Sequence, residues 1–462
     1  MGHLAGRARR VAGMTGTVDP LHDVPAATWR QSLARHAYSL LLASLKPVYL
    51  LRLWLRGRAE PLYRHKVLER LGDYREHRDL HDGRWLGDVW VHAVSLGETR
   101  AAAALIDALR AERPGLRLLL THSTATGREA GEALLREGDV QAWLPYDTPG
   151  VVQRFFEQFR PRVGVLMETE IWPNLLRRAQ GSGIPMVLAN ARLSEKSRRQ
   201  GERLAAVLRP AVEAITLVLA QTEADAQRLR DSGAREVVVC GNLKFDMAPD
   251  EALLARGRAW RHALARPVLL GAVMREGEEA MLLAEWAKRA AENRPLLLIV
   301  PRHPQRFDEV AALVQAAGLA LARRSGWGDT PPAEAWHADV WLGDSMREMA
   351  LYYAMADVAL LGGSFAPLGG QNLIEAAACG CPVVMGPHTF NFAQAAELSL
   401  AAGAALRVAD MAAGVDTACA LLDSPEREQR AAQARAFAAA HRGAARRMTG
   451  YLLRWLPVKA AS

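Results

Sequence analysis

The chain has 462 residues, of which 50% are hydrophobic and 23% are charged. This mix excludes a disordered or fibrous protein, and the length exceeds what one hydrophobic core usually supports. We therefore expect two domains of roughly 150 to 200 residues each. The formal net charge of +8 favours an anionic partner: nucleic acid, a membrane or a phosphorylated substrate. Because the sequence has no RNA-binding signature and no basic stretch with interleaved aromatic residues, we expect no nucleic-acid partner.

The four cysteines do not form a disulfide-framework pattern. Cys379 and Cys381 are a lone C-x-C pair beside an alanine-rich helix, which is a weak metal signal, and we expect no metal site. The lack of a disulfide framework favours a reducing, cytosolic compartment.

The chain begins with a basic extension, residues 1–35, to which we assign no role. The extension lacks a small-residue cleavage site after an apolar core, so it is not a typical signal peptide. Residues 36–85 are predicted to be a helical segment associated with a membrane. Its apolar part, residues 37–55, contains Lys46 and Pro47. A lysine near the centre of a spanning helix costs roughly 2.5–3.5 kcal/mol, which argues against a comfortable single span.

The same segment is rich in basic and aromatic residues. Between Lys46 and Arg70 there are seven basic residues against two acidic ones, interleaved with Tyr49, Trp54 and Tyr63. This composition is typical of a segment that lies in an anionic membrane interface. An ordinary pair of core helices and a short anchor with a positive cytoplasmic flank are the alternatives.

From residue 88 onward the chain repeats one unit: an apolar strand, a glycine-rich or polar turn, and an amphipathic helix. This alternation predicts parallel sheets with both faces covered by helices. The pattern restarts near residue 267, so we expect an α/β protein with two Rossmann-like, doubly wound domains that face a cleft. The predicted boundaries are an N-terminal domain at 86–245, a linker at 246–262, a C-terminal domain at 263–440, and a tail or helix at 441–462.

Ligands of such domains bind beyond the carboxyl ends of the strands. Neither half has G-x-G-x-x-G after its first strand, and no Walker A motif is present, which disfavours hydride transfer and ATP hydrolysis. In the second half, Gly362 and Gly363 follow a strand, and Gly369 and Gly370 open a helix. Glycines let a backbone approach a phosphate, although an ordinary tight turn explains them too.

Charged residues of the second half stand at strand ends and helix starts. Glu375 lies about one turn into the helix after Gly370, where it can accept ribose hydroxyls. Arg302 and His303 follow a strand and can neutralise a phosphate or carboxylate. Residues 344–348 begin another helix, where they fit a base or ribose, or serve only as a surface cap or ion pair.

In the first half the candidate base is Glu98, in the turn after the first strand. A sugar transfer needs a base that takes the proton of the attacking hydroxyl. The alternative is that Glu98 only complements the helix dipole, worth about 0.3–1 kcal/mol. Glu168 and Glu170 form a second carboxylate candidate, and Lys244 can stabilise negative charge.

These motifs together resemble the family of Kdo (3-deoxy-D-manno-octulosonic acid) transferases. The match runs in order from about residue 36 to 405, and its most specific strings are E-T-E-x-W-P-N and N-L-K-F-D. The matching segments are 92–98 (HAVSLGE), 167–174 (METEIWPN), 190–194 (NARLS), 241–246 (GNLKFD), 301–304 (PRHP), 362–364 (GGS) and 386–392 (GPHTFNF).

The resemblance implies a GT-B fold, with an N-terminal acceptor domain and a C-terminal donor domain. It also implies an inverting glycosyltransferase of lipopolysaccharide core biosynthesis, with CMP-Kdo as donor substrate and no cofactor. The acceptor would be a lipid A precursor of the lipid IVA type. The location would be the cytoplasmic side of the inner membrane of a Gram-negative bacterium.

Residue by residue, the resemblance makes Glu98 the catalytic base and makes Glu168 and Lys244 stabilisers of the transition state. The expected CMP contacts are Arg302, His303, Met346, Arg347, Glu348, Asn372, Leu373, Ile374 and Glu375. One departure stands out, because the family usually has Met-Gly-Glu where this chain has Met346-Arg347-Glu348.

Two other functions fit the same two-domain plan. One is a nucleotide-sugar epimerase, which needs no lipid acceptor and no membrane segment. The other is a membrane-bound nucleotide-sugar sensor or scaffold that has lost activity. Turnover without a lipid would indicate the first, and nucleotide binding without turnover would indicate the second.

Overall fold

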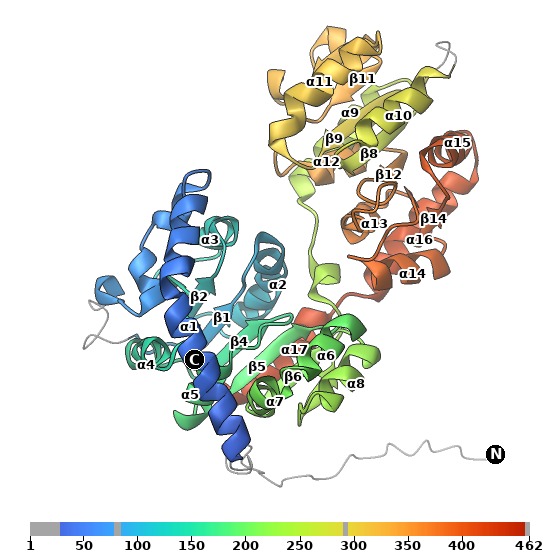
Figure 1. The fold of residues 1–462 in the computed structure, drawn as a ribbon. Coiled ribbons are helices and arrows are strands. Elements are labelled where there is room, and N and C mark those ends of the chain that lie inside the picture. Colours follow the sequence, from blue (N-terminus) through green and yellow to red (C-terminus); the bar gives the residue numbers. More distant parts are fainter. Residues whose placement is uncertain (1–27, 78–84, 290–293, 458–462) are drawn as a thin grey trace, which may run out of the picture. The chain divides into compact units, whose positions relative to one another are not determined.

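The computed structural model describes residues 28–77, 85–289 and 294–457. The chain forms two compact units (Figure 1). Unit 1 comprises Met1–Cys240 together with Met448–Ser462, and unit 2 comprises Gly241–Arg447. Most of the N-terminal extension predicted at 1–35 lies outside the described residues.

Unit 1 is built on a seven-stranded parallel sheet with the order β3-β2-β1-β4-β5-β6-β7. Every residue of its first six strands is buried, as expected for strands with helices on both faces. The strands are β1 (Val89–His92), β2 (Leu118–His122), β3 (Val140–Trp143), β4 (Val163–Met167), β5 (Met186–Ala191), β6 (Leu217–Ala220) and β7 (Val237–Val239).

Several helices of unit 1 start at capping side chains directly after a strand. Ser95, Thr124, Ser194 and Thr222 each accept a hydrogen bond from the backbone N–H three residues further on. Such caps satisfy N–H groups that have no partner inside the helix. The helices are α2 (Leu96–Glu112), α3 (Ala125–Glu132), α4 (Pro149–Gln158), α5 (Pro173–Gly181), α6 (Glu195–Glu202), α7 (Ala205–Glu213) and α8 (Glu223–Asp231).

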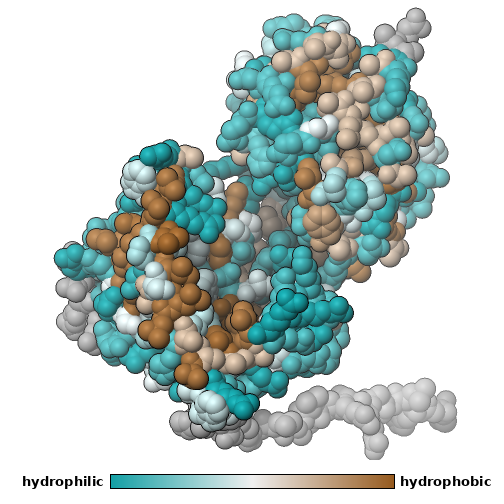
Figure 2. All heavy atoms as spheres, in the orientation of Figure 1, coloured by the Kyte–Doolittle hydropathy of each residue, from teal (hydrophilic) through white to brown (hydrophobic). Residues whose placement is uncertain are grey.

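The N-terminal helix α1 (Trp29–Arg56) lies on unit 1 and leaves an apolar face exposed. Tyr38 donates to Asp147 Oδ2 at 2.9 Å, and Tyr146 donates to Leu42 O at 2.9 Å, so the helix is fastened by polar contacts. Apolar atoms gather along it in Figure 2. Large exposed apolar side chains of this helix are Trp29, Leu33, Leu40, Leu41, Leu45, Val48, Leu51, Trp54 and Leu55.

None of the helices in the described ranges combines the length and the apolar character needed to cross a bilayer.

Unit 2 repeats the plan with the order β10-β11-β9-β8-β12-β13-β14, all parallel. Its strands are β8 (Val268–Met274), β9 (Leu296–Pro301), β10 (Leu321–Arg323), β11 (Val340–Leu342), β12 (Val358–Leu361), β13 (Val383–Met385) and β14 (Ala405–Arg407). Its helices are α9 (Glu251–Ala263), α10 (Glu278–Ala287), α11 (Phe307–Ala316), α12 (Met349–Met355), α13 (Leu373–Cys379), α14 (Ala393–Ala401), α15 (Met411–Leu422) and α16 (Glu426–Ala440). The two sheets confirm the predicted pair of Rossmann-like, doubly wound domains.

The boundary between the units differs from the predicted linker at 246–262. Most of that stretch forms α9, which packs against α12 and buries Leu254 and Trp260. Gly257 lies between them on the same helix face, and a Cβ there would come within 2.3 Å of Leu351 O. The spacing of three residues between these positions is a helical signal that the sequence interpretation missed.

The chain returns to unit 1 within α17 (Ala444–Leu452), which lies inside the region 441–462 predicted to be a tail or helix. Unit 2 begins at Gly241, so it includes residues 241–245, which the sequence interpretation assigned to the end of the first domain. There η4 (Leu243–Asp246) packs on α13 and places Phe245 against Phe437, with the ring centroids 5.5 Å apart.

Candidate functional site

In unit 1 the strand order reverses between β1 and β4, which is where open α/β sheets bind ligands. The loops after these two strands carry the candidate carboxylates. Glu98 stands in the first turn of α2, three residues after its N-cap Ser95. Glu168 and Glu170 follow β4 directly. The predicted acidic residues of the first half therefore occupy neighbouring loops at the switch point.

The Glu98 carboxylate is oriented by two donors. Its Oε2 accepts the Val94 N–H at 2.8 Å, and its Oε1 accepts the Ser95 hydroxyl at 3.1 Å. Ser95 Oγ also accepts the Glu98 N–H at 3.4 Å, so the pair forms a reciprocal cap. These contacts fix the carboxylate at the start of α2, on the side of the sheet where the loops after β1 and β4 meet.

Glu168 is buried and has a left-handed backbone, with φ at 57°. Non-glycine residues adopt this conformation rarely, and such strain collects at functional sites. Its Oε2 accepts from Arg192 Nε at 2.9 Å. Arg192 belongs to the motif 190–194 after β5, and the sequence interpretation gave it no role of its own.

Glu170 is the carboxylate whose proton affinity is most changed in this cluster. Burial first, and then the charge of Glu98, raise its pKa to about 7, and the charge of Glu168 adds to this. Trp172 Nε1 donates to Glu170 Oε2 at 2.8 Å and acts in the opposite direction. Three carboxylates thus lie close enough to disfavour full ionisation of all three at neutral pH.

A neutral histidine lies beneath this cluster. His92, the last residue of β1, is fully buried, and burial lowers its pKa to about 3. Its Nδ1 lies 3.1 Å from Thr121 O, an acceptor, which assigns the ring proton to Nδ1. Its Nε2 lies 3.9 Å from Glu170 Oε2. The sequence interpretation treated His92 only as part of a motif.

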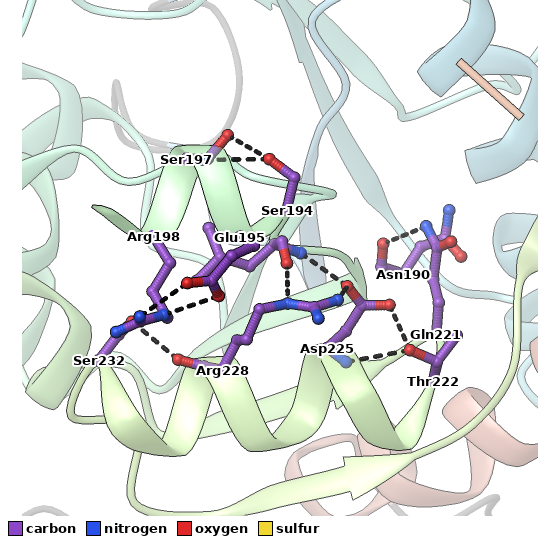
Figure 3. Close-up of polar contacts among 11 residues, drawn as sticks. Asn190, Ser194, Glu195, Ser197, Arg198, Gln221, Thr222, Asp225, Arg228 and Ser232 are labelled. Atoms are coloured by element: carbon purple, nitrogen blue, oxygen red, sulfur yellow. Dashed lines mark hydrogen bonds and ion pairs between the residues drawn. The ribbon is translucent and has the colours of Figure 1, made fainter. Parts of the chain in front are cut away.

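The loop that carries Arg192 is held in place from α8 (Figure 3). Asp225 accepts the Leu193 N–H at 2.9 Å and the Arg228 guanidinium at 3.0 Å. Arg228 Nε donates to Leu193 O. Gln221 Nε2 donates to Asn190 O at 2.9 Å. Both ends of the motif are therefore anchored, and Arg192 projects from a supported backbone.

In unit 2 the strand order reverses between β8 and β12. The glycine-rich turn after β12 lies against the end of β8: Gly362 N donates to Ala272 O, and a Cβ on Gly362 would lie 2.2 Å from Val273 O. Gly363 has a φ of 70°, and its carbonyl accepts the Gly370 N–H at 2.7 Å. Glycine is required here for packing and for conformation.

Arg302 and His303 follow β9, the other neighbour of β8. Both are partly exposed, and His303 Nε2 lies 3.8 Å from Glu276 Oε1. Burial, followed by the charges of Arg302 and Arg275, lowers the pKa of His303. This strand end is a cationic rim that suits a phosphate or carboxylate.

Residues 346–348 precede α12, with Met346 and Arg347 exposed. Arg347 has a φ of 67°, the conformation that the glycine of the Met-Gly-Glu pattern adopts without cost. Glu348 accepts from Arg324 Nη2 at 2.8 Å, which makes its carboxylate part of the local framework. The departure at Arg347 therefore changes the side chain and keeps a glycine-like backbone.

Asn372 caps α13 through its side chain, and Glu375 lies partly exposed in the first turn. Leu373 and Ile374 are core residues, 1% and 2% exposed, so their side chains pack inside unit 2. Only their backbones can offer contacts at the helix start.

Lys244 lies in unit 2, not at the end of unit 1. Its Nζ is 5.5 Å from the ring centroid of Phe392. The structure therefore groups Lys244 with the strand-end residues of unit 2, and Glu98 with Glu168 in unit 1. Within the described residues no group of three or more histidines, cysteines and acids is arranged to hold a metal ion.

Comparisons with known proteins agree with these motifs. The family model "3-Deoxy-D-manno-octulosonic-acid transferase (kdotransferase)" matches residues 65–247. A 3-deoxy-D-manno-octulosonic acid transferase of Bordetella pertussis is 51% identical over 439 residues, covering 92% of this chain and 100% of the relative. One of Haemophilus influenzae is 33% identical over 404 residues, covering 86% and 92%.

Two solved structures share the two-unit fold. A UDP-GlcNAc 2-epimerase of Neisseria meningitidis has a TM-score of 0.55 at 16% identity, covering 79% of this chain and 100% of that chain. A glycosyltransferase of Rickettsia africae has a TM-score of 0.52 at 12% identity, covering 81% and 100%. The fold is GT-B, and at these identities the likeness speaks for the fold alone.

Proposed function

The chain belongs to the family of 3-deoxy-D-manno-octulosonic acid transferases, and we propose that it moves Kdo from CMP-Kdo to a lipid A precursor of the lipid IVA type, with Glu98 as general base. Membership in this family makes the chain a glycosyltransferase of lipopolysaccharide biosynthesis. The proposal adds the donor, the acceptor and the residues that act.

The observation that carries the proposal is the carboxylate cluster at the β1–β4 switch point. Val94 and Ser95 hold the Glu98 carboxylate in a fixed orientation at this switch point, which suits a base that takes the proton of the attacking hydroxyl. The hydroxyl oxygen forms a bond to the anomeric carbon as the bond from that carbon to the CMP phosphate breaks. One base and one direct displacement imply inversion at that carbon.

Neighbouring groups support the base. Glu168, paired with Arg192, provides a fixed negative charge that stabilises the positive charge developing on the sugar ring. Glu170 has a pKa of about 7, so it is protonated in part of the molecules at neutral pH, and this reduces the negative charge near Glu98. In unit 2, Lys244 and Arg302 supply the positive charge that a departing phosphate needs, and His303 can add a hydrogen bond from its ring.

The remaining donor contacts follow the strand ends of unit 2. The partly exposed Glu375 suits the ribose hydroxyls, and residues 346–348 with Asn372 lie where they can contact the nucleobase of the donor. Leu373 and Ile374 contribute through backbone atoms because their side chains are buried. No cofactor enters this reaction, since the activated donor already carries the leaving group.

The test is turnover with defined substrates. Purified protein given CMP-Kdo and lipid IVA should release CMP, and mass spectrometry should find Kdo on the lipid. Glu98→Gln should abolish release while keeping its cap, because glutamine serves equally well at that capping position. Glu112→Gln, an exposed carboxylate at the far end of α2, is the matched control. An active Glu98→Gln variant would remove the assigned base.

The same assay separates the alternatives. Turnover of a nucleotide sugar without lipid would favour an epimerase, whose fold likeness in the comparisons is structural only. Nucleotide binding without turnover would favour a sensor. Family membership favours transfer over both.

We further propose that α1 rests on the cytoplasmic surface of the inner membrane. Its exposed apolar face adjoins a group of cations that make no ion pair within the described residues: Arg35, Lys46, Arg52, Arg56, Arg58 and Arg64. Arg58 and Arg64 flank the Trp54 ring at 4.6 and 5.0 Å from its centroid. An apolar face edged by cations and aromatic rings is typical of an interfacial helix.

Vesicle co-sedimentation tests this placement. The protein should bind vesicles with anionic phosphatidylglycerol and bind neutral phosphatidylcholine vesicles far more weakly. Changing Leu40 and Leu41 to serine should lower binding, whereas Met281→Ser, an exposed apolar side chain of α10, should not. Equal binding of all three proteins to anionic vesicles would contradict the proposal.

A further inference from the structure

Glu278 is a fully buried carboxylate at the first position of α10, and the sequence analysis gave it no role. It is 0% exposed, and no lysine or arginine of the described chain pairs with it as an ion pair. A buried carboxylate without a cation must be stabilised by hydrogen-bond donors. Its donors show what it does.

Four backbone N–H groups donate to this carboxylate. Oε2 accepts from Arg275 at 3.0 Å and from Gly363 at 2.6 Å. Oε1 accepts from Phe365 at 3.0 Å and from Ala366 at 3.1 Å. One side chain thus uses both oxygens to join the loop after β8 to the glycine-rich turn after β12.

These two loops flank the switch point of the unit 2 sheet, because β8 and β12 are neighbours there. The turn also packs on the end of β8 without space for a side chain, because a Cβ on Gly362 would lie 2.2 Å from Val273 O. Val273 is a β-branched residue with a φ of 53°, a conformation that persists only under external constraint. The Glu278 bridge supplies part of that constraint.

The bridge also reaches the helix after the turn. Gly363 donates to Glu278 through its N–H and accepts the Gly370 N–H through its carbonyl at 2.7 Å. Gly370 lies two residues before Asn372, the cap of α13. The carboxylate therefore sets the position of the turn, and the turn sets the start of the helix that bears Glu375.

We infer that Glu278 is a positioning residue for the donor nucleotide: it holds the β8 loop and the 362–366 turn in the arrangement that receives CMP-Kdo. This inference rests on the proposed function, which places the donor in unit 2. Glu278 acts through the turn and not on the substrate, because its side chain is fully buried and both of its oxygens accept backbone N–H groups of the protein.

The adjacent residue provides a matched control. Glu279 is equally buried, but its Oε2 lies 3.2 Å from Nη2 of Arg306, which belongs to the segment after β9 and not to the glycine-rich turn. Both residues stand in the first turn of α10. Glutamine keeps the length and shape of either side chain, and only the change at Glu278 places an amide group among the four backbone donors.

The experiment compares Glu278→Gln with Glu279→Gln in steady-state assays of CMP release. We expect Glu278→Gln to raise the KM for CMP-Kdo and the Kd for CMP roughly tenfold, with the KM for the lipid acceptor unchanged. Glu278→Asp, which keeps the charge, should recover part of the loss. Amide hydrogen exchange should quicken at Gly363, Phe365 and Ala366 in Glu278→Gln only.

The outcomes separate the two claims. If wild-type protein releases CMP but both glutamine variants show the same donor KM and CMP Kd, the positioning role of Glu278 is refuted and the proposed function stands. If wild-type protein releases no CMP from CMP-Kdo, the proposed function fails and this inference fails with it. Should Glu278→Gln not fold, the comparison of Glu278→Asp with Glu279→Asp decides in the same way.

Discussion

Arg192 Nε lies 2.9 Å from Glu168 Oε2, and this ion pair joins the loops that follow the adjacent strands β5 and β4. The two side chains differ in exposure: Glu168 is 8% exposed and Arg192 is 50% exposed. Arginine thus approaches from the solvent side and fixes a carboxylate that emerges from a strained backbone. A pair of this kind orients Glu168 and limits the repulsion among three neighbouring carboxylates.

Removing the guanidinium should therefore impair chemistry more than binding. We expect Arg192→Ala to lower kcat roughly 10- to 100-fold with a smaller change in the KM for CMP-Kdo, and Arg192→Lys to recover only part because it cannot reproduce a guanidinium contact. Steady-state assays of CMP release measure both constants.

The control for that prediction lies on α6, seven residues away. Arg199 is 73% exposed and pairs with Glu195 within the same helix, so Arg199→Ala should leave kcat within about twofold. A comparable loss of kcat in both variants would show that the loss reflects general disturbance of the loop.

Much of the fold was predictable because its signals are local. Parallel strands that are buried on both faces have continuous apolar sequences. Ser95 and Thr124, which follow strands, are residues that commonly cap the start of a helix. The glycines at 362–363 and 369–370 were predicted to form either a phosphate-binding turn or an ordinary tight turn, and three of them have a positive φ.

The features that escaped prediction depend on pairings that are distant in sequence. Arg192 and Glu168 are 24 residues apart, and Glu278 and Gly363 are 85 apart, so no periodicity could join them. Residues 246–262 were predicted as a linker, whereas most of them form α9, whose contacts are with α12, about 90 residues further along the chain. Arg347 shows a further limit, because its side chain gives no sign in the sequence that its backbone has the left-handed conformation that glycine adopts freely.

The raised pKa of Glu170 predicts a pH dependence of stability. In the unfolded chain its pKa lies near the ordinary 4.5, and in the folded protein it is about 7. The folded state therefore holds the extra proton between these values, and the stabilisation present below pH 4.5 is lost as the pH rises through 7. The largest effect is roughly 3 kcal/mol.

Glu170→Gln should remove the part of the pH dependence of stability that comes from this carboxyl group. Heat-unfolding temperatures of unit 1, measured from pH 5 to 8.5, should fall less steeply for Glu170→Gln than for wild-type protein. Glu223→Gln, whose side chain is 74% exposed on α8, should follow the wild-type curve. Parallel curves for wild type and Glu170→Gln would contradict the assignment.

Glu69 predicts the opposite pH dependence. Its buried carboxylate accepts from His77 Nε2 at 2.9 Å, Arg128 Nη1 at 3.3 Å and the Trp143 N–H at 2.8 Å. Burial raises the pKa of Glu69, but these partners outweigh burial and hold it below 4.5. The contribution of Glu69 to the free energy of unfolding is present above pH 4.5 and is lost as the pH falls below that value.

Glu69→Gln leaves Arg128 buried beside a neutral side chain. We expect a loss of about 3–5 kcal/mol, or roughly 6–20 °C in the unfolding temperature of unit 1 at pH 7. Glu76→Gln removes the partner of Lys66 at a site where the acid is 69% exposed, and it should leave the unfolding temperature almost unchanged. Equal shifts in the two variants would refute the buried network as the cause.

The left-handed backbone of Arg347 predicts a stabilising substitution. For an L-residue with a side chain this conformation costs roughly 1–2 kcal/mol, whereas glycine adopts it freely. Arg347→Gly should therefore raise the free energy of unfolding of unit 2 by up to about 1 kcal/mol, once the greater chain entropy of unfolded glycine is subtracted. Arg347→Val should lower the free energy of unfolding. Met346→Gly is the control at the neighbouring exposed position, which has no positive φ, and there glycine should destabilise by about 0.5–1 kcal/mol. Destabilisation of the same size by glycine at both positions would show that the Arg347 backbone is not left-handed in solution.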